Sequence, residues 1–414
     1  MKKVTFAVMG MGDRGTEYAK MQLKYPKEME VTAIADVDPL RLQAANQFLH
    51  LPENRLFASG EEMAKKPNLA DVMVISTQDQ QHCEHAIWAM QNGYHLLLEK
   101  PIATNEEDVR KVLAAAEKYN RTVIVCHVLR YTPFYRKIRE LILSGTLGKI
   151  ESIDAAERIG YYHFAHSYVR GNWNKFAVSS SMLLAKSGHD MDIIYWLTGK
   201  KCKKVSSFGS LDHFNAANCP EGAAERCSDG CPVKDCPYNA VDFYLSRMPE
   251  WPANVLSPKP NEENIMRSLR TTDYGRCVYQ LDNDVVDHQA VNLLLEDGVV
   301  ANFSVSAFTG DIDRTIHVMG TKGEVYGKLS ENRLTLCVFG TDAQTIDLAQ
   351  FDDARGHGGG DEGMIYDLIR LMRGDRFDTD AVSFLMPSAE SHFICFAAEQ
   401  SRLQNGTATD VDAY

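Results

Sequence analysis

A glutamate, a lysine and a proline stand together where a short apolar stretch ends. Residues 95–98 have the length of a buried strand, and Glu99, Lys100 and Pro101 follow directly. Because proline disfavours helical geometry in the residue before it, Lys100 is expected at the carboxyl end of this strand. In an open parallel sheet that end binds ligands, and a sheltered lysine there can exchange a proton with a substrate. A lysine that merely reaches solvent is the alternative.

A glycine-rich turn near the amino terminus indicates which ligand such a lysine would serve. An apolar run over residues 4–9 leads into the turn, and residues 16–23 then look helical. Between a strand and a helix, such glycines allow a tight turn and close approach of the backbone to a pyrophosphate. The predicted cofactor-binding residues of this turn are Gly10, Met11, Gly12, Arg14 and Gly15.

An aspartate ends the second predicted strand, residues 31–35. Asp36 lies about 20 residues beyond Gly15, the spacing at which a carboxylate meets a ribose 2′-hydroxyl. A carboxylate there repels a 2′-phosphate, so we expect NAD, with NADP less favoured. Arg41, a few residues further on, would soften that preference.

Strands and helices alternate through the first third of the chain. Further strands are predicted over residues 71–76, 95–98 and 122–126, and helices over 80–91 and 106–119. This order predicts a doubly wound parallel sheet, a Rossmann NAD-binding domain over residues 1–127. Thr77 and His82, close to the end of the 71–76 strand, are further cofactor contacts, although a packing role is the alternative for His82.

The order of the motifs resembles a known enzyme family. Gly10-Met-Gly-Asp-Arg-Gly, Asp36, Glu99-Lys100-Pro101 and His127-Val-Leu-Arg130-Tyr-Thr-Pro133 look like the glucose-fructose oxidoreductase and inositol dehydrogenase (Gfo/Idh/MocA) family, over essentially the whole chain. The resemblance implies that Lys100 lies close to the nicotinamide and the reacting carbon, that Glu99 contacts the nicotinamide side, and that Arg130 lies where two domains meet.

The second part of the chain, residues 128–414, changes to strand-like alternation. Strands are predicted over residues 149–158, 204–211, 276–281, 286–295, 299–308, 315–319 and 334–339, and final helices over 362–372 and 388–404. Asp297-Gly298 is typical of a tight hairpin. We expect an α+β domain with a large, mainly antiparallel open sheet, one face toward the first domain and the other covered by helices. The resemblance implies a homo-oligomer that forms through this sheet.

One predicted helix, residues 183–199, carries titratable groups in an apolar pattern. His189 and Asp192 fall on one face, and a core histidine satisfied by Asp192 is one interpretation. The resemblance implies instead that His189 is catalytic. The aspartate that the family often has four residues earlier is Ala185 here, with Lys186 beside it. The substrate-side candidates are Arg130, Lys186, Asp192 and His357, the last in a glycine-rich loop that could close over substrate.

Two other groups of residues leave alternatives open. Tyr161, Tyr162, His163 and His166 suit either a sugar ring or packing within their own domain. Cys219, Cys227, Cys231 and Cys236 lie in a Cys- and Pro-rich insertion near residues 212–262. Their spacing is looser than paired CxxC motifs, so a zinc site and free thiols both remain open.

Composition narrows the possible functions. The chain has 414 residues, is 44% hydrophobic and carries a formal net charge of -12, which argues against nucleic acid or an anionic membrane as partner. No apolar run reaches the length of about 18 residues that a membrane span needs. The apolar stretch after Lys2 and Lys3 is too short for a signal peptide, so we expect a soluble, cytoplasmic protein.

Taken together, the motifs predict an NAD-dependent oxidoreductase. A secondary hydroxyl of a sugar, sugar derivative or cyclic polyol would lose its proton to Lys100 or His189 and its hydride to the nicotinamide. Two alternatives remain: an NAD-dependent glycoside hydrolase that works by transient oxidation and elimination, and a dinucleotide-binding regulator without catalysis.

Overall fold

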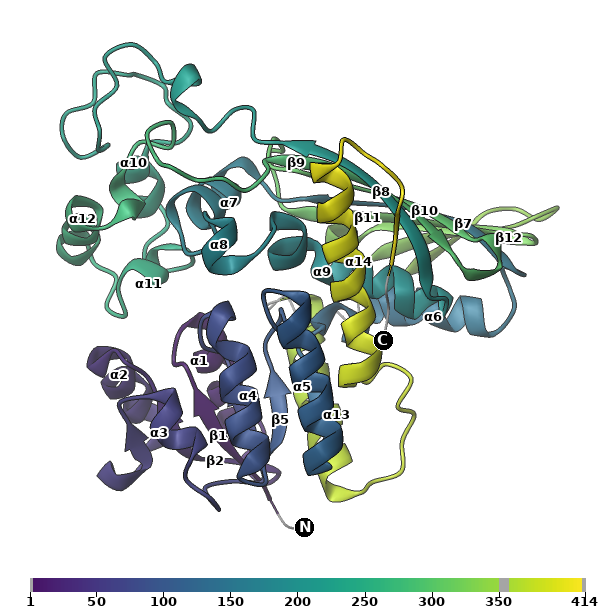
Figure 1. Cartoon of the computed structure of the whole chain (residues 1–414), viewed down its shortest axis with the longest axis horizontal. Helices are drawn as coiled ribbons and strands as arrows, with labels where there is room; N and C mark the ends of the chain where they lie inside the picture. The colour runs from purple at the N-terminus through teal and green to yellow at the C-terminus, as the bar shows by residue number, and fades with distance from the viewer. Residues whose placement is uncertain (1–2, 350–356, 412–414) are drawn as a thin grey trace.

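The computed structural model of the chain describes residues 3–349 and 357–411 and contains two sheets (Figure 1). The first sheet has six parallel strands in the order β3-β2-β1-β4-β5-β6. The strands are β1 (Val4–Met9), β2 (Met29–Ala35), β3 (Leu56–Phe57), β4 (Val72–Ile75), β5 (His95–Leu98) and β6 (Val123–Val125). Every residue of β4 is buried, as expected for a strand covered on both faces. The predicted doubly wound sheet is confirmed.

Helices α1 (Asp13–Lys24), α2 (Pro39–Leu49), α3 (Gly60–Ala64), α4 (His82–Gln91) and α5 (Glu106–Tyr119) connect these strands. Local sequence explains where α5 begins and ends. The Asn105 side chain accepts a hydrogen bond from the backbone of Asp108, three acidic residues occupy the first turn and Lys118 lies in the last. These features satisfy free N–H groups and complement the helix dipole.

The second sheet has nine strands in the order β14-β13-β12-β11-β7-β10-β9-β8-β15. They are β7 (Ile150–Arg158), β8 (Cys202–Ser210), β9 (His288–Leu295), β10 (Val300–Ser306), β11 (Asp313–Gly320), β12 (Gly323–Lys328), β13 (Arg333–Val338), β14 (Gln344–Asp347) and β15 (Thr409–Asp410). All neighbours are antiparallel except β7 and β10. The β9–β10 hairpin turns at Asp297-Gly298 as predicted.

The strand predicted over residues 276–281 is wrong. Only Arg276 forms an isolated bridge, with Arg226 of the insertion. The backbone here binds the insertion instead, since Cys277 donates to the carbonyl of Glu225. The alternating pattern therefore reflects packing on a loop rather than pairing in the sheet.

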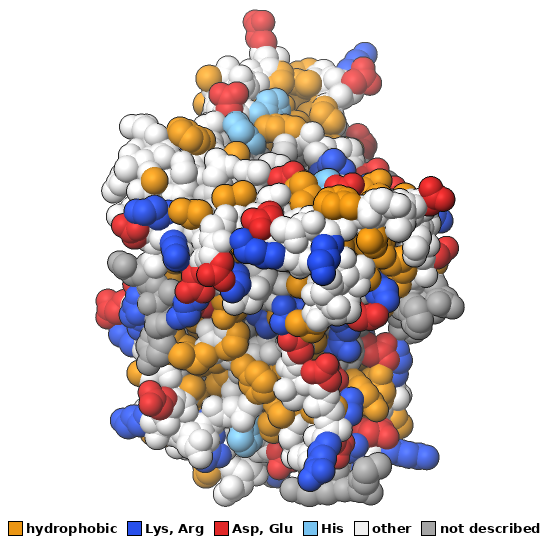
Figure 2. Space-filling view, turned by 90° about the vertical axis from the view of Figure 1, so that its right-hand side faces the viewer, with side chains coloured by type: hydrophobic (Ala, Val, Ile, Leu, Met, Phe, Trp, Pro, Cys, Tyr) orange, Lys and Arg blue, Asp and Glu red, His pale blue; other side chains and the backbone are white. Residues whose placement is uncertain are grey.

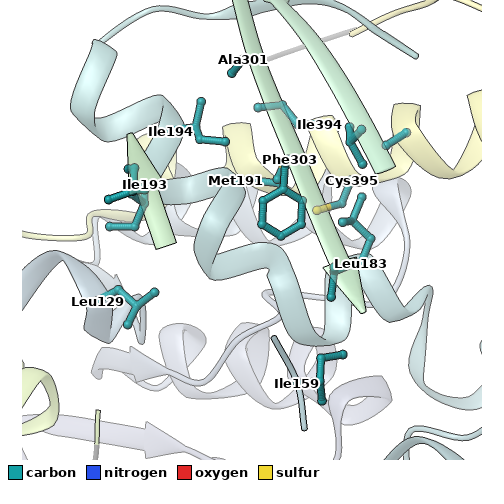
Figure 3. Close-up of a cluster of buried hydrophobic side chains, with 14 of the residues drawn as sticks. Leu129, Ile159, Leu183, Met191, Ile193, Ile194, Ala301, Phe303, Ile394 and Cys395 are labelled. Carbon is teal, nitrogen blue, oxygen red and sulfur yellow. The ribbon is translucent and has the colours of Figure 1, made fainter. Parts of the chain in front are cut away.

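One face of the second sheet is covered by α6 (Pro133–Leu143), α9 (Met182–Thr198) and α14 (Leu385–Leu403). Figure 3 shows Met191 of α9 beside Phe303 of β10 and Cys395 of α14. The same helical layer contacts the first domain, because α14 packs on α5 and β6. The expectation that helices cover the face away from the first domain is therefore wrong. Outward residues alternate with buried ones along β9 and β10, which leaves the other face open.

Late helices also complete the core of the first sheet. Helix α13 (Gly360–Arg373) buries Met364, Ile365 and Leu368 in one cluster with Phe6 and Val8 of β1. Leu385, Ala389 and Phe393 of α14 join the cluster on the opposite face. Residues far beyond 127 thus support the nucleotide-binding sheet.

The segment between β8 and β9 forms a small lobe of its own, at the upper left of Figure 1. It contains α10 (Ala240–Leu245), α11 (Ala253–Leu256) and α12 (Glu262–Thr271), packed around Tyr244, Ile265 and Leu269. It lies against α7 (Tyr161–Phe164) and the π-helical turn Ala165–Arg170. Helix α8 (Phe176–Ser179) follows.

The surface is mixed in charge. Figure 2 shows basic and acidic side chains interspersed over one face of the molecule. Among the described residues, no helix has both the length and the apolar content that a bilayer span requires.

Candidate active site

The glycine turn is shaped by close backbone contacts. Gly10 has a φ of 87°, and a Cβ there would stand 2.4 Å from the carbonyl oxygen of Ser76. A Cβ on Gly15 would stand 1.8 Å from the carbonyl oxygen of Gly10. At Gly12 such an atom would meet only the Arg41 guanidinium, at 3.2 Å. Gly10 and Gly15 are thus required by packing, whereas Gly12 leaves the outside of the turn open, as a bound pyrophosphate needs.

Asp36 lies beside this turn, at the end of β2. One carboxylate oxygen accepts a hydrogen bond from the backbone N–H of Met11 at 2.6 Å, and the other accepts one from Asp38 at 2.8 Å. The carboxylate therefore fixes the glycine turn and presents negative charge next to it.

Glu99 is buried at the end of β5. It accepts hydrogen bonds from Arg14 at 2.9 Å, from the Tyr18 hydroxyl at 2.6 Å and from the backbone of Lys100 at 3.0 Å. Burial opposes ionisation, but the Arg14 guanidinium and these hydrogen bonds hold the pKa of Glu99 below its usual value. Arg14 also pairs with Asp361 of α13, so its guanidinium is engaged within the protein.

Thr77 and His82 organise the neighbouring loops. The Thr77 hydroxyl lies 3.0 Å from the Nδ1 atom of His85. The two ring nitrogens of the buried His82 lie 2.6 Å from the carbonyl oxygen of Pro101 and 3.1 Å from that of Thr77. His82 therefore ties the loop after β4 to the loop that carries Lys100.

Lys100 connects the two domains. Its ammonium donates a hydrogen bond of 2.5 Å to the carbonyl oxygen of Ala185, in the first turn of α9. The next residue, Lys186, pairs with Glu157 of β7 at 3.3 Å. Lys100 thus lies where the nucleotide-binding sheet meets the helix that carries His189.

An ion network surrounds Lys186. Glu157, which is 1% exposed, also accepts hydrogen bonds from Ser187 at 2.7 Å and from Arg314. Arg314 in turn pairs with Asp190 at 3.0 Å. Burial raises the pKa of Asp190 to about 7, against the attraction of Arg314. Burial, with the nearby Arg314 and Lys100 charges, lowers the pKa of Lys186 although Glu157 opposes the shift.

His189 is 7% exposed, and its ring stands nearly perpendicular to that of His127, with the centroids 5.7 Å apart. Asp192, three residues further along α9, accepts two hydrogen bonds from Arg130, at 2.7 and 2.6 Å. Both members of this pair are buried. Asp192 thus neutralises Arg130, and the two side chains support α9 from within.

The other residues that the sequence suggested for substrate binding lie in different surroundings. Gly358 and Gly359 lie in the turn before α13, which packs on the segment Val128–Tyr131, but the side chain of His357 lies outside the described part of the structure. His166 binds the Tyr244 hydroxyl of the insertion at 2.8 Å and is a packing residue. His163 lies against Trp251 of the insertion, with ring centroids 4.9 Å apart.

Sequence reasoning missed several charged residues of the site. They are Asp79, Glu157, Asp190 and Arg314, all buried. Asp79 lies in the turn Asp79–Gln81 after β4 and accepts the indole N–H of Trp173 at 2.9 Å, a second tie between the domains. Adjacent charged residues directly before a predicted strand, as Asp313-Arg314 stand before residues 315–319, are the signal that could have identified the arginine.

The cysteines are free thiols, and several of the insertion line one small cavity together with Cys277. Among the residues that the structure describes, no three His, Cys, Asp or Glu side chains are grouped as ligands of a metal ion.

A glycine turn on a parallel sheet, joined through a lysine to a second domain, defines a two-domain dinucleotide-dependent oxidoreductase. Comparison with models of protein families supports this class. Residues 4–127 match the NAD-binding Rossmann fold of the Gfo/Idh/MocA oxidoreductase family, and residues 139–376 match its C-terminal alpha/beta domain. The chain belongs to the Gfo/Idh/MocA family and is an NAD(P)-dependent oxidoreductase of that type.

Individual relatives share only a small part of their sequence with this chain. YteT of Bacillus subtilis (strain 168), designated an oxidoreductase, is 25% identical over 390 residues, which is 89% of each chain. Myo-inositol 2-dehydrogenase of Thermotoga maritima is 26% identical over 209 residues, 49% of this chain and 58% of that one. The structure of a levoglucosan dehydrogenase in complex with NADH and L-sorbose superposes with a TM-score of 0.71 over 100% of both chains at 16% identity, which shows the shared fold.

Proposed function

We propose that this protein is an NAD-dependent dehydrogenase that oxidises a secondary hydroxyl of a carbohydrate or cyclic polyol. The observation that carries the proposal is the contact of Lys100 with the first turn of α9, one helical turn before His189. This contact supports a site to which each domain contributes one side chain able to exchange a proton.

The glycine turn and Asp36 fit NAD better than NADP. Gly12 leaves space where a pyrophosphate would lie, and the carboxylate beside it would repel a 2′-phosphate. The residues that would hold the cofactor are Gly10, Met11, Gly12, Gly15, Asp36 and Thr77, with Arg14, His82 and Glu99 acting through the bonds described above. When bound, NAD supplies the hydride acceptor.

The protein's own groups then have distinct roles. Lys100 or His189 accepts the hydroxyl proton, because a lysine and a histidine at the junction of the domains can each exchange a proton with a substrate. Glu99 holds the backbone of Lys100 and, through Arg14, the start of α13. Lys186 contacts the substrate, whereas Arg130 and Asp192 keep α9 in position. Relatives named as inositol and levoglucosan dehydrogenases support a polyol or sugar substrate.

The test is a screen of sugars, polyols and nitrophenyl glycosides with NAD, on the natural protein and on Lys100→Met. We expect net NADH formation with at least one free sugar or polyol. The variant should lose at least about a hundredfold in turnover, the usual contribution of an acid or base, and keep its affinity for NADH. Release of nitrophenol without net NADH would instead show a glycoside hydrolase, and an unchanged variant would refute the role of Lys100.

We also propose that the open face of the second sheet joins two copies of the chain. Leu294 and Val300 are cross-strand partners on this face and are 38% and 44% exposed, and Phe208 and Tyr326 lie exposed on other strands of the sheet. Burial of such apolar side chains favours association. Light scattering should show an oligomer that Val300→Lys dissociates; a monomeric natural protein would refute this assignment.

A further inference from the structure

Several cationic side chains gather where α9 meets the nucleotide-binding domain. Lys100, Lys186 and Arg314 contribute three cationic side chains that influence one another. Glu157 and Asp190 are the carboxyl groups bound to them. Burial raises the pKa of Asp190 to about 7, so this carboxyl is only partly ionised near neutral pH.

The other nearby carboxyl groups bind donors other than the ammonium groups of Lys100 and Lys186. Glu99 is engaged by Arg14 and Tyr18, and Asp79 by Trp173. Burial raises the pKa of Asp79, which favours its neutral form. The paired Arg130 and Asp192 cancel. Lys186 and Arg314 therefore share the Glu157 carboxylate, and the Lys100 ammonium binds a carbonyl oxygen rather than a carboxylate, which is costly for groups this sheltered from water.

Lys186 has donors to spare. Its ammonium can donate three hydrogen bonds, and among residues 3–349 and 357–411 its one ion-pair partner is the Glu157 carboxylate. Because 14% of its side chain is exposed, a ligand can reach it. Within the described residues, the buried Nδ1 atom of His163 has no hydrogen-bond partner. His163 lies near enough to Lys186 and Lys100 that their charges, added to burial, lower its pKa well below the usual value.

We infer that the substrate carries an anionic group, a carboxylate or a phosphate, and that Lys186 binds this group while Lys100 faces the reacting hydroxyl. This inference rests on the proposed dehydrogenase function and adds the chemical class of the carbohydrate. His163 supplies a second polar contact to the same ligand. Lys186 is thus a specificity-determining residue, and Glu157 holds its ammonium in place.

Equilibrium binding to the NADH-loaded protein tests the charge requirement without turnover. The probes are D-glucose, D-glucuronate and D-glucose 6-phosphate, with D-galactose and D-galacturonate as a second pair, all at one ionic strength because salt screens such interactions. We expect at least one anionic member to bind roughly tenfold or more tightly than its neutral counterpart. Preference for the uronate identifies a carboxylate, and preference for the sugar phosphate identifies a phosphate; either supports the inference.

Variants connect the preference to Lys186. Lys186→Met should reduce the ratio of anionic to neutral affinity to about one, whereas Lys186→Arg should keep most of it. Arg314 and Ser187 still bind Glu157 in both variants, so the fold should persist, as circular dichroism can verify. The matched control is Lys328→Met, because Lys328 pairs with the buried Asp313 at 3.2 Å, much as Lys186 pairs with Glu157. This control should leave the ratio unchanged.

The outcomes separate this inference from the proposed function. Neutral sugars that bind or react as well as their anionic counterparts would overturn the inference, as would a full preference in Lys186→Met. Both results leave the dehydrogenase intact if NADH still forms. Conversely, selective binding of an anionic sugar without NADH formation from any probe would retain the anion site and count against the dehydrogenase.

Discussion

The indole N–H of Trp173 donates a hydrogen bond of 2.9 Å to the Asp79 carboxylate across the two domains. Asp79 lies in the turn after β4, and Trp173 lies between the π-helical turn and α8 of the second domain. Together with Lys100 and Ala185, this pair fixes how the domains face each other.

Removing this indole should loosen the interface. Trp173→Phe leaves a buried carboxyl without its donor, which costs about 1–3 kcal/mol. Urea unfolding should show that loss, whereas Asp79→Asn keeps an acceptor oxygen and should lose less. Equal losses in the two variants would mean that an amide oxygen cannot replace the carboxylate as the acceptor of the indole N–H.

Asp36 should decide between the two dinucleotides. Replacing it with Ser removes the negative charge beside the glycine turn, so affinity for NADP relative to NAD should rise at least about tenfold. Fluorescence titration with both reduced cofactors measures this ratio. Glu61→Gln is the control, because Glu61 of α3 is an exposed carboxylate of the same domain that pairs with Lys65. No change in the ratio for Asp36→Ser would contradict the assigned role.

The two carboxyl groups on Arg314 should differ in their contributions to stability. The pKa of Glu157 is held low by Arg314 and Lys186 against burial, so at pH 5 it stays ionised, and Glu157→Gln should cost about 3–5 kcal/mol. The pKa of Asp190 is raised to about 7, so this group is mostly protonated at pH 5 and Asp190→Asn should cost far less.

The pH dependence of the unfolding free energy follows from the raised pKa of Asp190. Between about pH 4 and 7 the unfolded chain ionises Asp190 while the folded protein keeps its proton, so the contribution of this group to stability falls as pH rises through that range. Asp190→Asn should flatten this part of the curve of unfolding free energy against pH. An unaltered curve would show that Asp190 is ionised in the folded state.

Acid should destabilise the protein through buried histidines. Burial, with the nearby Arg170 charge, lowers the pKa of His166 to about 3, so the unfolded chain binds a proton that the folded protein refuses between about pH 6.5 and 3. Stability from this group is therefore complete above that range and is lost on acidification. His166→Phe should reduce the slope of melting temperature against pH between 4 and 6; an unchanged slope would refute this source.

The first domain was predictable because its signals are local. Continuous apolar runs such as Val4–Met9 become buried parallel strands with nearly the expected bounds, and the glycine turn follows at once. In the second sheet, β12 was missed, since Gly323–Lys328 contains two glycines and two charged residues and is recognised only by its pairing with β11 and β13.

The residues of the candidate site also fall into those with a local sequence signal and those without one. Lys100 and His189 lie in motifs that short stretches of sequence reveal. Glu157 and Arg314 become partners only because β7 and β11 pair in the register that sets them opposite each other. Such contacts between strands more than a hundred residues apart have no local signature, so the ion network around Lys186 could not be predicted.

The return of α13 and α14 to the first sheet has a consequence for biosynthesis. A ribosome completes β1 to β6 long before it makes α13 and α14. Helix α13 covers Phe6 on one face of the first sheet, and Phe393 of α14 packs on the opposite face. The nascent amino-terminal part must therefore wait, with apolar surface uncovered, until almost the entire polypeptide has emerged. We expect a fragment that stops at residue 127 to aggregate when it is expressed alone.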